Sequence, residues 1–276
     1  LTNTVTVAST VSGAAVNVTS GASNTTTVAV GNNAVTGTYT LAGTSDEITI
    51  DNGGSISGVN AGAATTAEEI VLNTAGKGAG LGSDVTMTVV QHEAFSTVTA
   101  GGTTDQITFS GAGGATTINA EAAIETYVLA GAAATTNTLN VDAGNASVNI
   151  TGAASNDTVN IAGLTVDGTY ALGGGLDTIV ATTGADITGV NAGADTSAEQ
   201  LTLSGAITMT QAQHEALIAD SGIVDGDAGA SAEQVTITTS GGITADDDVE
   251  TYVLANNTLT NTVTVASTVS GAAVNV

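Results

Sequence analysis

The 276-residue chain contains no cysteine, no proline and no tryptophan, and its only basic side chain is Lys77. Its 26 acidic residues give a formal net charge of −25. Without clusters of lysine and arginine the chain cannot neutralise phosphates, so nucleic acid is excluded as a partner. Acidic polysaccharides and anionic lipids are disfavoured in the same way unless a divalent cation bridges the two surfaces. No apolar run reaches the roughly 18 residues of a membrane-spanning helix, so we expect no direct membrane insertion.

Aromatic residues are also scarce, at 2% of the chain, although apolar residues reach 42%. A core without large rings must be built from small β-branched and aliphatic side chains, which suit narrow stacked sheets. The absence of proline leaves the hydrogen bonds of strands uninterrupted, and the 36 glycines supply tight turns. This composition favours an all-β protein with a thin core.

A long internal repeat is the clearest feature of the sequence. The 18 residues LTNTVTVASTVSGAAVNV at positions 1–18 return unchanged at positions 259–276, which gives a period of 258 residues. Self-similarity of this kind is typical of arrays in which each repeat stacks on its neighbours. We therefore interpret the chain as an excerpt from a tandem array, with residues 259–276 as the start of the next repeat.

A weaker repeat divides the long one into two halves. The segment ISGVNAGAATTAEEIVL at 56–72 matches ITGVNAGADTSAEQLTL at 187–203, and IETYVLA at 124–130 matches VETYVLA at 249–255. The sequence TLNVDAG near Leu139 resembles the opening of the chain. We therefore predict a first half-repeat at 1–138 and a second at 139–258.

Short alternating apolar pairs recur about every ten residues, separated by turn-forming Gly, Asn, Asp and Ser. The pairs in the first half include Val5/Val7, Val28/Val30, Ile48/Ile50 and Ile70/Leu72. This spacing predicts a parallel β-solenoid, a β-roll or β-helix, with about 10 residues per strand. A tandem array of β-sandwiches is the rival, but it requires longer strands and aromatic anchors.

One segment in each half has a helical pattern instead. Thr88 and Thr210 each begin a capping box of the form T-x-x-Q, and His-Glu-Ala follows the glutamine. We predict short looped-out helices near 88–95 and 210–218, with a charged face in solvent. His92 and His214 are expected to be partly exposed helix residues, and a zinc site at either is disfavoured because further ligands are lacking.

Many acidic residues stand immediately before a predicted strand. The segments GAASNDTVNI at 152–161 and GGGLDTIVA at 173–181 resemble the repeat-in-toxin nonapeptide G-G-x-G-x-D-x-U-x. That resemblance implies a calcium-binding β-roll and makes Asp157 and Asp177 candidate calcium ligands. The Thr-, Ala- and Gly-rich texture of the whole chain resembles bacterial surface-layer proteins and giant adhesins. This second resemblance implies an exported protein at the cell surface.

Two further acidic clusters are candidate calcium sites on residue type alone, because calcium takes six to eight oxygen ligands from flexible loops. In DGDAGASAE the oxygen-bearing residues stand at alternate positions, and in ADDDVE three carboxylates are adjacent and repel one another unless a cation is present. The candidate ligands are Asp225, Asp227, Ser231, Glu233, Asp246, Asp247 and Asp248.

Three classes of function follow from these patterns. The first is a structural repeat that forms an extracellular filament, stalk or surface layer by stacking on copies of itself, end to end and laterally. The second is a binding module, either a calcium-stiffened adhesin shaft or an ice-binding solenoid, although the T-x-T motifs are too irregular for a flat ice-binding face. The third is an enzyme such as a polysaccharide lyase, which the lack of Arg, Lys and aromatic residues disfavours.

Overall fold

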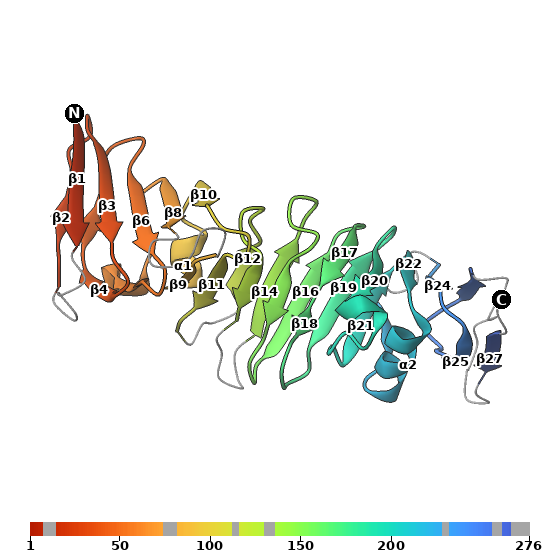
Figure 1. Cartoon of the computed structure of the whole chain (residues 1–276). Helices are drawn as coiled ribbons and strands as arrows, with labels where there is room; N and C mark the ends of the chain where they lie inside the picture. The colour runs from red at the N-terminus through yellow and green to blue at the C-terminus, as the bar shows by residue number, and fades with distance from the viewer. Residues whose placement is uncertain are drawn as a thin grey trace. The chain divides into compact units, whose positions relative to one another are not determined.

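The fold is a parallel β-solenoid of about 10 turns, with two α-helices in the described residues (Figure 1). The computed structural model describes residues 1–7, 15–73, 82–111, 116–129, 136–227, 232–255 and 261–265. The chain divides into two compact units, Leu1–Gly131 and Ala132–Val276. The predicted all-β solenoid is confirmed, and the sandwich alternative does not describe the fold.

Two parallel sheets form the walls of unit 1. The first has five strands in the order β1-β3-β6-β8-β10, and in the second β4, β7, β9, β11 and β13 pair in succession. The chain alternates between the sheets, so that each coil adds one strand to each wall. The elements are β1 (Thr2–Val7), β2 (Val18–Thr19), β3 (Thr25–Val30), β4 (Ala34–Gly37), β5 (Tyr39–Thr40), β6 (Glu47–Asp51), β7 (Ser55–Val59), η1 (Asn60–Gly62), β8 (Glu69–Asn73), β9 (Asp84–Met87), α1 (Val89–His92), β10 (Thr97–Ala100), β11 (Gln106–Phe109), β12 (Thr116–Asn119) and β13 (Thr126–Val128).

Unit 2 has the same construction. The strands β14, β16, β19, β21 and β23 pair in succession, and the opposite sheet has the order β17-β20-β22-β24-β26. The elements are β14 (Thr136–Val141), β15 (Asn149–Thr151), β16 (Asn156–Ile161), β17 (Thr165–Gly168), β18 (Tyr170–Ala171), β19 (Thr178–Thr182), β20 (Asp186–Val190), η2 (Asn191–Gly193), β21 (Gln200–Ser204), β22 (Ala206–Met209), α2 (Gln211–Ala219), β23 (Ile223–Asp225), β24 (Gln234–Ile237), β25 (Gly241–Ala245), β26 (Thr251–Leu254) and β27 (Asn261–Val265).

The core of each unit is a set of straight columns of aliphatic side chains. In unit 1, Val28, Ile48 and Ile70 lie in register on β3, β6 and β8, and each is 0% exposed. The period-2 alternation of a strand sends every second side chain inward, so the predicted apolar pairs became the core. Each fully buried side chain of this size contributes about 1.5–3 kcal/mol, which stacked short strands need because none is stable alone.

A repeated asparagine turn links successive coils in both units. Asn60 and Ala61 have left-handed φ values of 49° and 53°, and Asn191 and Ala192 repeat these values in unit 2. The Asn60 Oδ1 accepts the Tyr39 N–H at 2.9 Å, and its Nδ2 donates to the Tyr39 carbonyl at 3.3 Å. Asparagine tolerates the left-handed region, and its amide here replaces a backbone bridge to the preceding coil. This pairing accounts for the shared VNAGA sequence.

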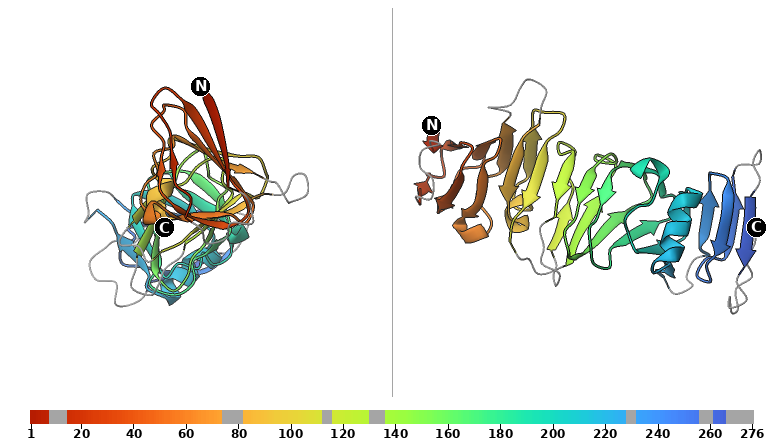
Figure 2. Two further views of the ribbon diagram at one scale, coloured as in Figure 1. Left: turned by 90° about the vertical axis from the view of Figure 1, so that its left-hand side faces the viewer. Right: turned by 60° about the horizontal axis from the view of Figure 1, so that its bottom comes forward.

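The two predicted helices are present, and both capping boxes are formed. Thr88 and Thr210 accept the N–H of the third helical residue, and the side chains of Gln91 and Gln213 accept the N–H of the cap in return. Each helix lies in the connection between one sheet and the other. Figure 2 shows α2, in blue-green, beside the strands of unit 2.

The expected exposure of the two histidines is wrong. His92 is 2% exposed and His214 is 0% exposed, because the helices turn them toward the core. The His214 Nε2 lies 3.1 Å from the Tyr252 hydroxyl, and its Nδ1 lies 3.0 Å from the neighbouring Glu215 carboxylate. In unit 1 the ring of His92 meets Phe109 and Tyr127 edge-on. Each histidine therefore connects its helix to aromatic side chains of the wall.

Candidate functional site

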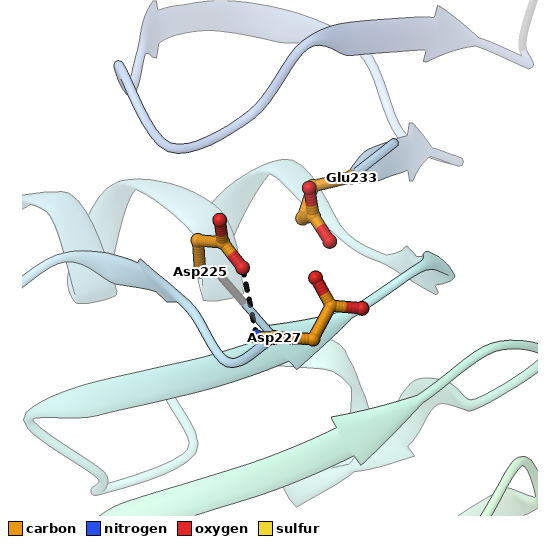
Figure 3. Close-up of side chains that lie close together, drawn as sticks. All are labelled: Asp225, Asp227 and Glu233. Carbon is orange, nitrogen blue, oxygen red and sulfur yellow. Dashed lines mark hydrogen bonds between the residues drawn. The ribbon is translucent and has the colours of Figure 1, made fainter. Parts of the chain in front are cut away.

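Three carboxylates converge where β23 ends and β24 begins. Asp225 is the last residue of β23, Asp227 lies in the loop that follows, and Glu233 immediately precedes β24. One ligand oxygen of each lies within 4.8 Å of the others. Figure 3 shows the carboxylates of Asp227 and Glu233 facing each other, with Asp225 beside them and bonded to the Asp227 N–H at 2.8 Å. We call these three residues the acidic triad.

The second predicted cluster lies against the triad. The Asp246 carboxylate accepts the Ile223 N–H at 3.2 Å, and the Asp248 carboxylate accepts the Asp225 N–H. Burial raises the pKa of Asp248, and the charges of Asp246 and Asp247 raise it further. Two acidic segments about twenty residues apart in sequence therefore meet in neighbouring coils.

The triad combines partly exposed and buried ligands. Asp225 and Asp227 are partly exposed, whereas Glu233 is 0% exposed and donates its backbone N–H to Glu250 at 2.7 Å. Oxygen ligands from a loop and a strand end are of the type that calcium prefers. A search of the described residues for three or more His, Cys, Asp or Glu side chains close enough to hold one metal ion finds the acidic triad. The predicted ligand Ser231 lies outside the described residues.

Asp157 and Asp177 lie away from the triad, at a corner of unit 2, and both are 0% exposed. The Asp177 Oδ1 accepts the Asp157 N–H at 2.7 Å, and the Asp177 N–H donates to Glu199 at 2.7 Å. Asp157 in turn accepts the Asn137 side-chain amide at 2.7 Å and the Ser155 hydroxyl at 3.1 Å. In this structure their carboxylates bind backbone and side-chain donors of the preceding coil and, for Asp157, the nearby Ser155 hydroxyl.

The same arrangement occurs in unit 1. Asp46 accepts the Thr26 N–H at 2.7 Å and the Gly43 N–H at 2.8 Å. Asp105 accepts the Gly102 N–H at 2.8 Å and the Ser83 N–H of the preceding coil at 2.5 Å. These aspartates connect coils at their corners, a role that sequence reasoning missed. The signal was present, because a glycine three residues ahead marks both positions (GTSD at 43–46 and GTTD at 102–105).

His214 and Glu215 of α2 form a second polar group with Tyr252 of β26, in which His214 and Tyr252 are buried and Glu215 is partly exposed. Burial lowers the pKa of His214, while the adjacent Glu215 carboxylate opposes this shift. Glu215 also accepts the Thr244 N–H at 2.7 Å, and the Tyr252 hydroxyl accepts the Asp246 N–H at 2.8 Å. The ring is therefore neutral near pH 7 and ties α2 to the next coil.

No protein-family model, curated protein or solved structure matches the chain. In the part of the chain that the structure describes, no helix is long and apolar enough to cross a membrane.

We expect the stability of unit 2 to fall as pH rises from about 4 to 6 and then to level off. Burial raises the pKa of Asp177 to about 6; the Asp157 N–H opposes this, and the charges of Glu199 and Asp157 add to it. The unfolded carboxyl titrates near ~3.9. A raised native pKa gives stability that is fully present below the unfolded value and is lost as pH approaches the native value.

Melting temperatures measured from pH 4 to 7 test this expectation. Asp177→Asn should flatten the fall between about pH 4 and 6, since it removes the titrating group. Asp220→Asn, at an exposed position after α2, is the control and should leave the slope unchanged. Equal slopes in the wild type and Asp177→Asn would contradict the assignment.

Proposed function

We propose that the chain is a structural, non-enzymatic repeat of an exported bacterial surface protein. Its solenoid coils stack continuously on further copies to build an extracellular filament, stalk or surface layer. One observation carries the proposal: parallel coils fill both units, and residues 1–18 recur at 259–276. A coil at the edge of a parallel stack presents unpaired backbone groups, and a further coil pairs them. The resemblance to surface-layer proteins and adhesins supports a place outside the cell.

The axial repeat of the assembled material tests the proposal. Successive coils of a solenoid rise by about 4.8 Å. Paired strands such as β6 and β8 are offset by 22 residues (Ile48 and Ile70), and the fold has about 10 turns. With ten to twelve coils in 258 residues, the repeat should advance about 48–58 Å along the axis. Fibre diffraction should show this spacing and a meridional reflection near ~4.8 Å. Strands parallel to the long axis, or a repeat outside roughly 35–65 Å, would refute the continuous stack.

A calcium-stiffened shaft is a second candidate, favoured by the acidic triad. With a charge of −25, self-repulsion opposes the compact state, and a cation at the triad reduces it locally. The neighbouring Asp246 and Asp248 add negative charge to the same region, which increases the attraction for a divalent ion. In this second reading Asp225, Asp227 and Glu233 supply ligands, and calcium stiffens the same stack.

Calcium should raise the melting temperature of the wild-type chain. At 100 times the dissociation constant, a ligand of the native state adds about 2.7 kcal/mol to the free energy of unfolding. The double variant Asp225→Asn, Asp227→Asn should lose most of this gain, and Asp220→Asn should keep it. Melting curves in chelator and in millimolar calcium, at constant ionic strength, measure the difference. An equal calcium effect in both variants would show that the ion acts elsewhere or only by screening.

A further inference from the structure

The five residues NTVTV occur twice in the described chain, in two different pairings. At positions 3–7 they belong to β1, which pairs with β3, the strand that follows it in the same sheet. At positions 261–265 they form β27, which pairs with β25, a strand that precedes it. The coils of each unit stack in chain order, so a strand has its predecessor along one edge and its successor along the other. The same five-residue strand is therefore seen paired along one edge with its successor, in β1, and along the other edge with its predecessor, in β27.

The exposure of one valine shows what the second copy lacks. Val7 is 4% exposed and lies in register with Val30 of β3. Val265, the same residue of the repeat, is 52% exposed. On the side of the preceding strand, Val265 already lies in register with Ala245 of β25. The successor strand is therefore what covers this position.

We propose that consecutive copies share this strand: β27 of one copy takes the place of residues 3–7 on β3 of the next, and keeps its pairing with β25. The proposal rests on the proposed function and names the surface through which copies join. The partner is a second copy of this same sequence, because only an identical strand reproduces the pairing that β3 already makes.

The register of the junction follows from the two observed ladders. β25 places Ile243 beside Val263, and β3 places Val28 beside Val5, the equivalent of Val263. Ile243 is 2% exposed and Val28 is 0% exposed, so the junction continues an aliphatic core column without a break. The next inward position continues in the same way, from Ala245 through Val265 to Val30.

Two free molecules can form the junction by exchange. Residues 261–265 of one molecule are identical to residues 3–7 of another, so replacing one by the other preserves the pairing of these five residues with β3. The exchange additionally covers Val265, because it gives β27 the successor strand that β1 has in β3. Identical segments that exchange between molecules are a low-cost route to assembly.

Engineered disulfides test the junction, because the chain has no cysteine of its own. In the shared strand, Thr262 replaces Thr4 beside Thr27, and Thr264 replaces Thr6 beside Ala29. The variants Thr27→Cys/Thr262→Cys and Ala29→Cys/Thr264→Cys are therefore in register. All four side chains are at least partly exposed, so two independent pairs are available if one variant folds poorly. Thr27→Cys/Thr264→Cys and Ala29→Cys/Thr262→Cys are controls on the same face, offset by two residues.

Adjacent strands lie about 4.8 Å apart, within the Cα separation of a disulfide, whereas a two-residue offset gives about 8 Å. After mild oxidation, non-reducing gels should show about tenfold more linked oligomers for the in-register pairs than for the controls. Equal linking in all four variants, or more in the controls, overturns the shared strand. Filaments in electron micrographs without in-register linking overturn the junction and leave the proposed function standing. If neither disulfide-linked oligomers nor filaments form, both the shared strand and the proposed function are contradicted.

Discussion

Gly152→Ala should destabilise unit 2 by about 3 kcal/mol, at the upper end of the cost of overpacking a well-packed site. A Cβ at this position would lie 1.8 Å from the Leu172 carbonyl oxygen and 2.6 Å from the Asp157 Oδ2. Leu172 belongs to the next coil, and the Gly152 N–H already donates to its neighbour Ala171 at 2.8 Å. A single methyl group must therefore push two hydrogen-bonded coils apart. Thermal or urea unfolding measures the loss.

Gly174→Ala is the matched control for this prediction. Nothing lies within 4 Å of a Cβ built on Gly174, and its φ is outside the left-handed region. The unfolded chain loses conformational freedom on a change from glycine to alanine, so this variant should be neutral or gain up to about 1 kcal/mol. If both variants lost the same stability, the close approach of the coils at Gly152 would not be the cause.

The walls of the solenoid could be predicted from the sequence because strand formation here depends on local alternation. Ile48 and Ile50, or Ile70 and Leu72, place apolar side chains two residues apart, and the structure buries all four. Glycine- and asparagine-rich turns mark the ends of these strands. The capping boxes at Thr88 and Thr210 were predictable for the same reason, since a cap is completed within four residues.

The coil-to-coil hydrogen bonds of the buried carboxylates could not be predicted in this way, although the glycine three residues before Asp46 and Asp105 was a local signal of their turn. An aspartate before a strand normally suggests solvent exposure, yet Asp46 and Asp177 are 0% exposed. Asp46 receives an N–H from Thr26, and Asp177 one from Asp157, both 20 residues earlier in the chain. Sequence patterns within a window of ten residues contain no information about these donors. The pairing register of the coils supplies it, and that register is known only from the structure.

The acidic triad was partly predictable. The alternation of oxygen-bearing residues in DGDAGASAE brought attention to Asp225, Asp227 and Glu233, whose carboxylates do converge. The contact between this segment and Asp248 was not foreseen, because it depends on β25 delivering its following loop to the neighbouring coil. The burial of the histidines was missed for a related reason, since a short helix gives little periodicity from which to find its inner face.

Gln213→Leu should destabilise unit 2 by about 4 kcal/mol, although leucine fills a similar volume. The Gln213 amide is 0% exposed, and its Nε2 donates to the carbonyls of Ile187 and Val190 at 2.7 and 3.1 Å. Its Oε1 accepts the Thr210 N–H at 2.9 Å, which completes the capping box of α2. Leucine leaves three buried backbone groups without this partner, and each such group costs about 1–3 kcal/mol.

Unit 1 offers an independent copy of the same test. The Gln91 Nε2 donates to the carbonyls of Ile56 and Val59 at 2.8 and 3.0 Å, so Gln91→Leu should cause a similar loss there. Gln234→Leu is the matched control, because that amide is partly exposed and its hydrogen bond is to the Thr236 hydroxyl at 3.5 Å. Its effect should stay within about 0.5 kcal/mol, as for most surface substitutions. Free energies of unfolding from urea titrations compare the three variants. If Gln213→Leu lost no more stability than Gln234→Leu, water would have to reach the Ile187 and Val190 carbonyls. The packing of α2 against the strands would then not exclude solvent from them.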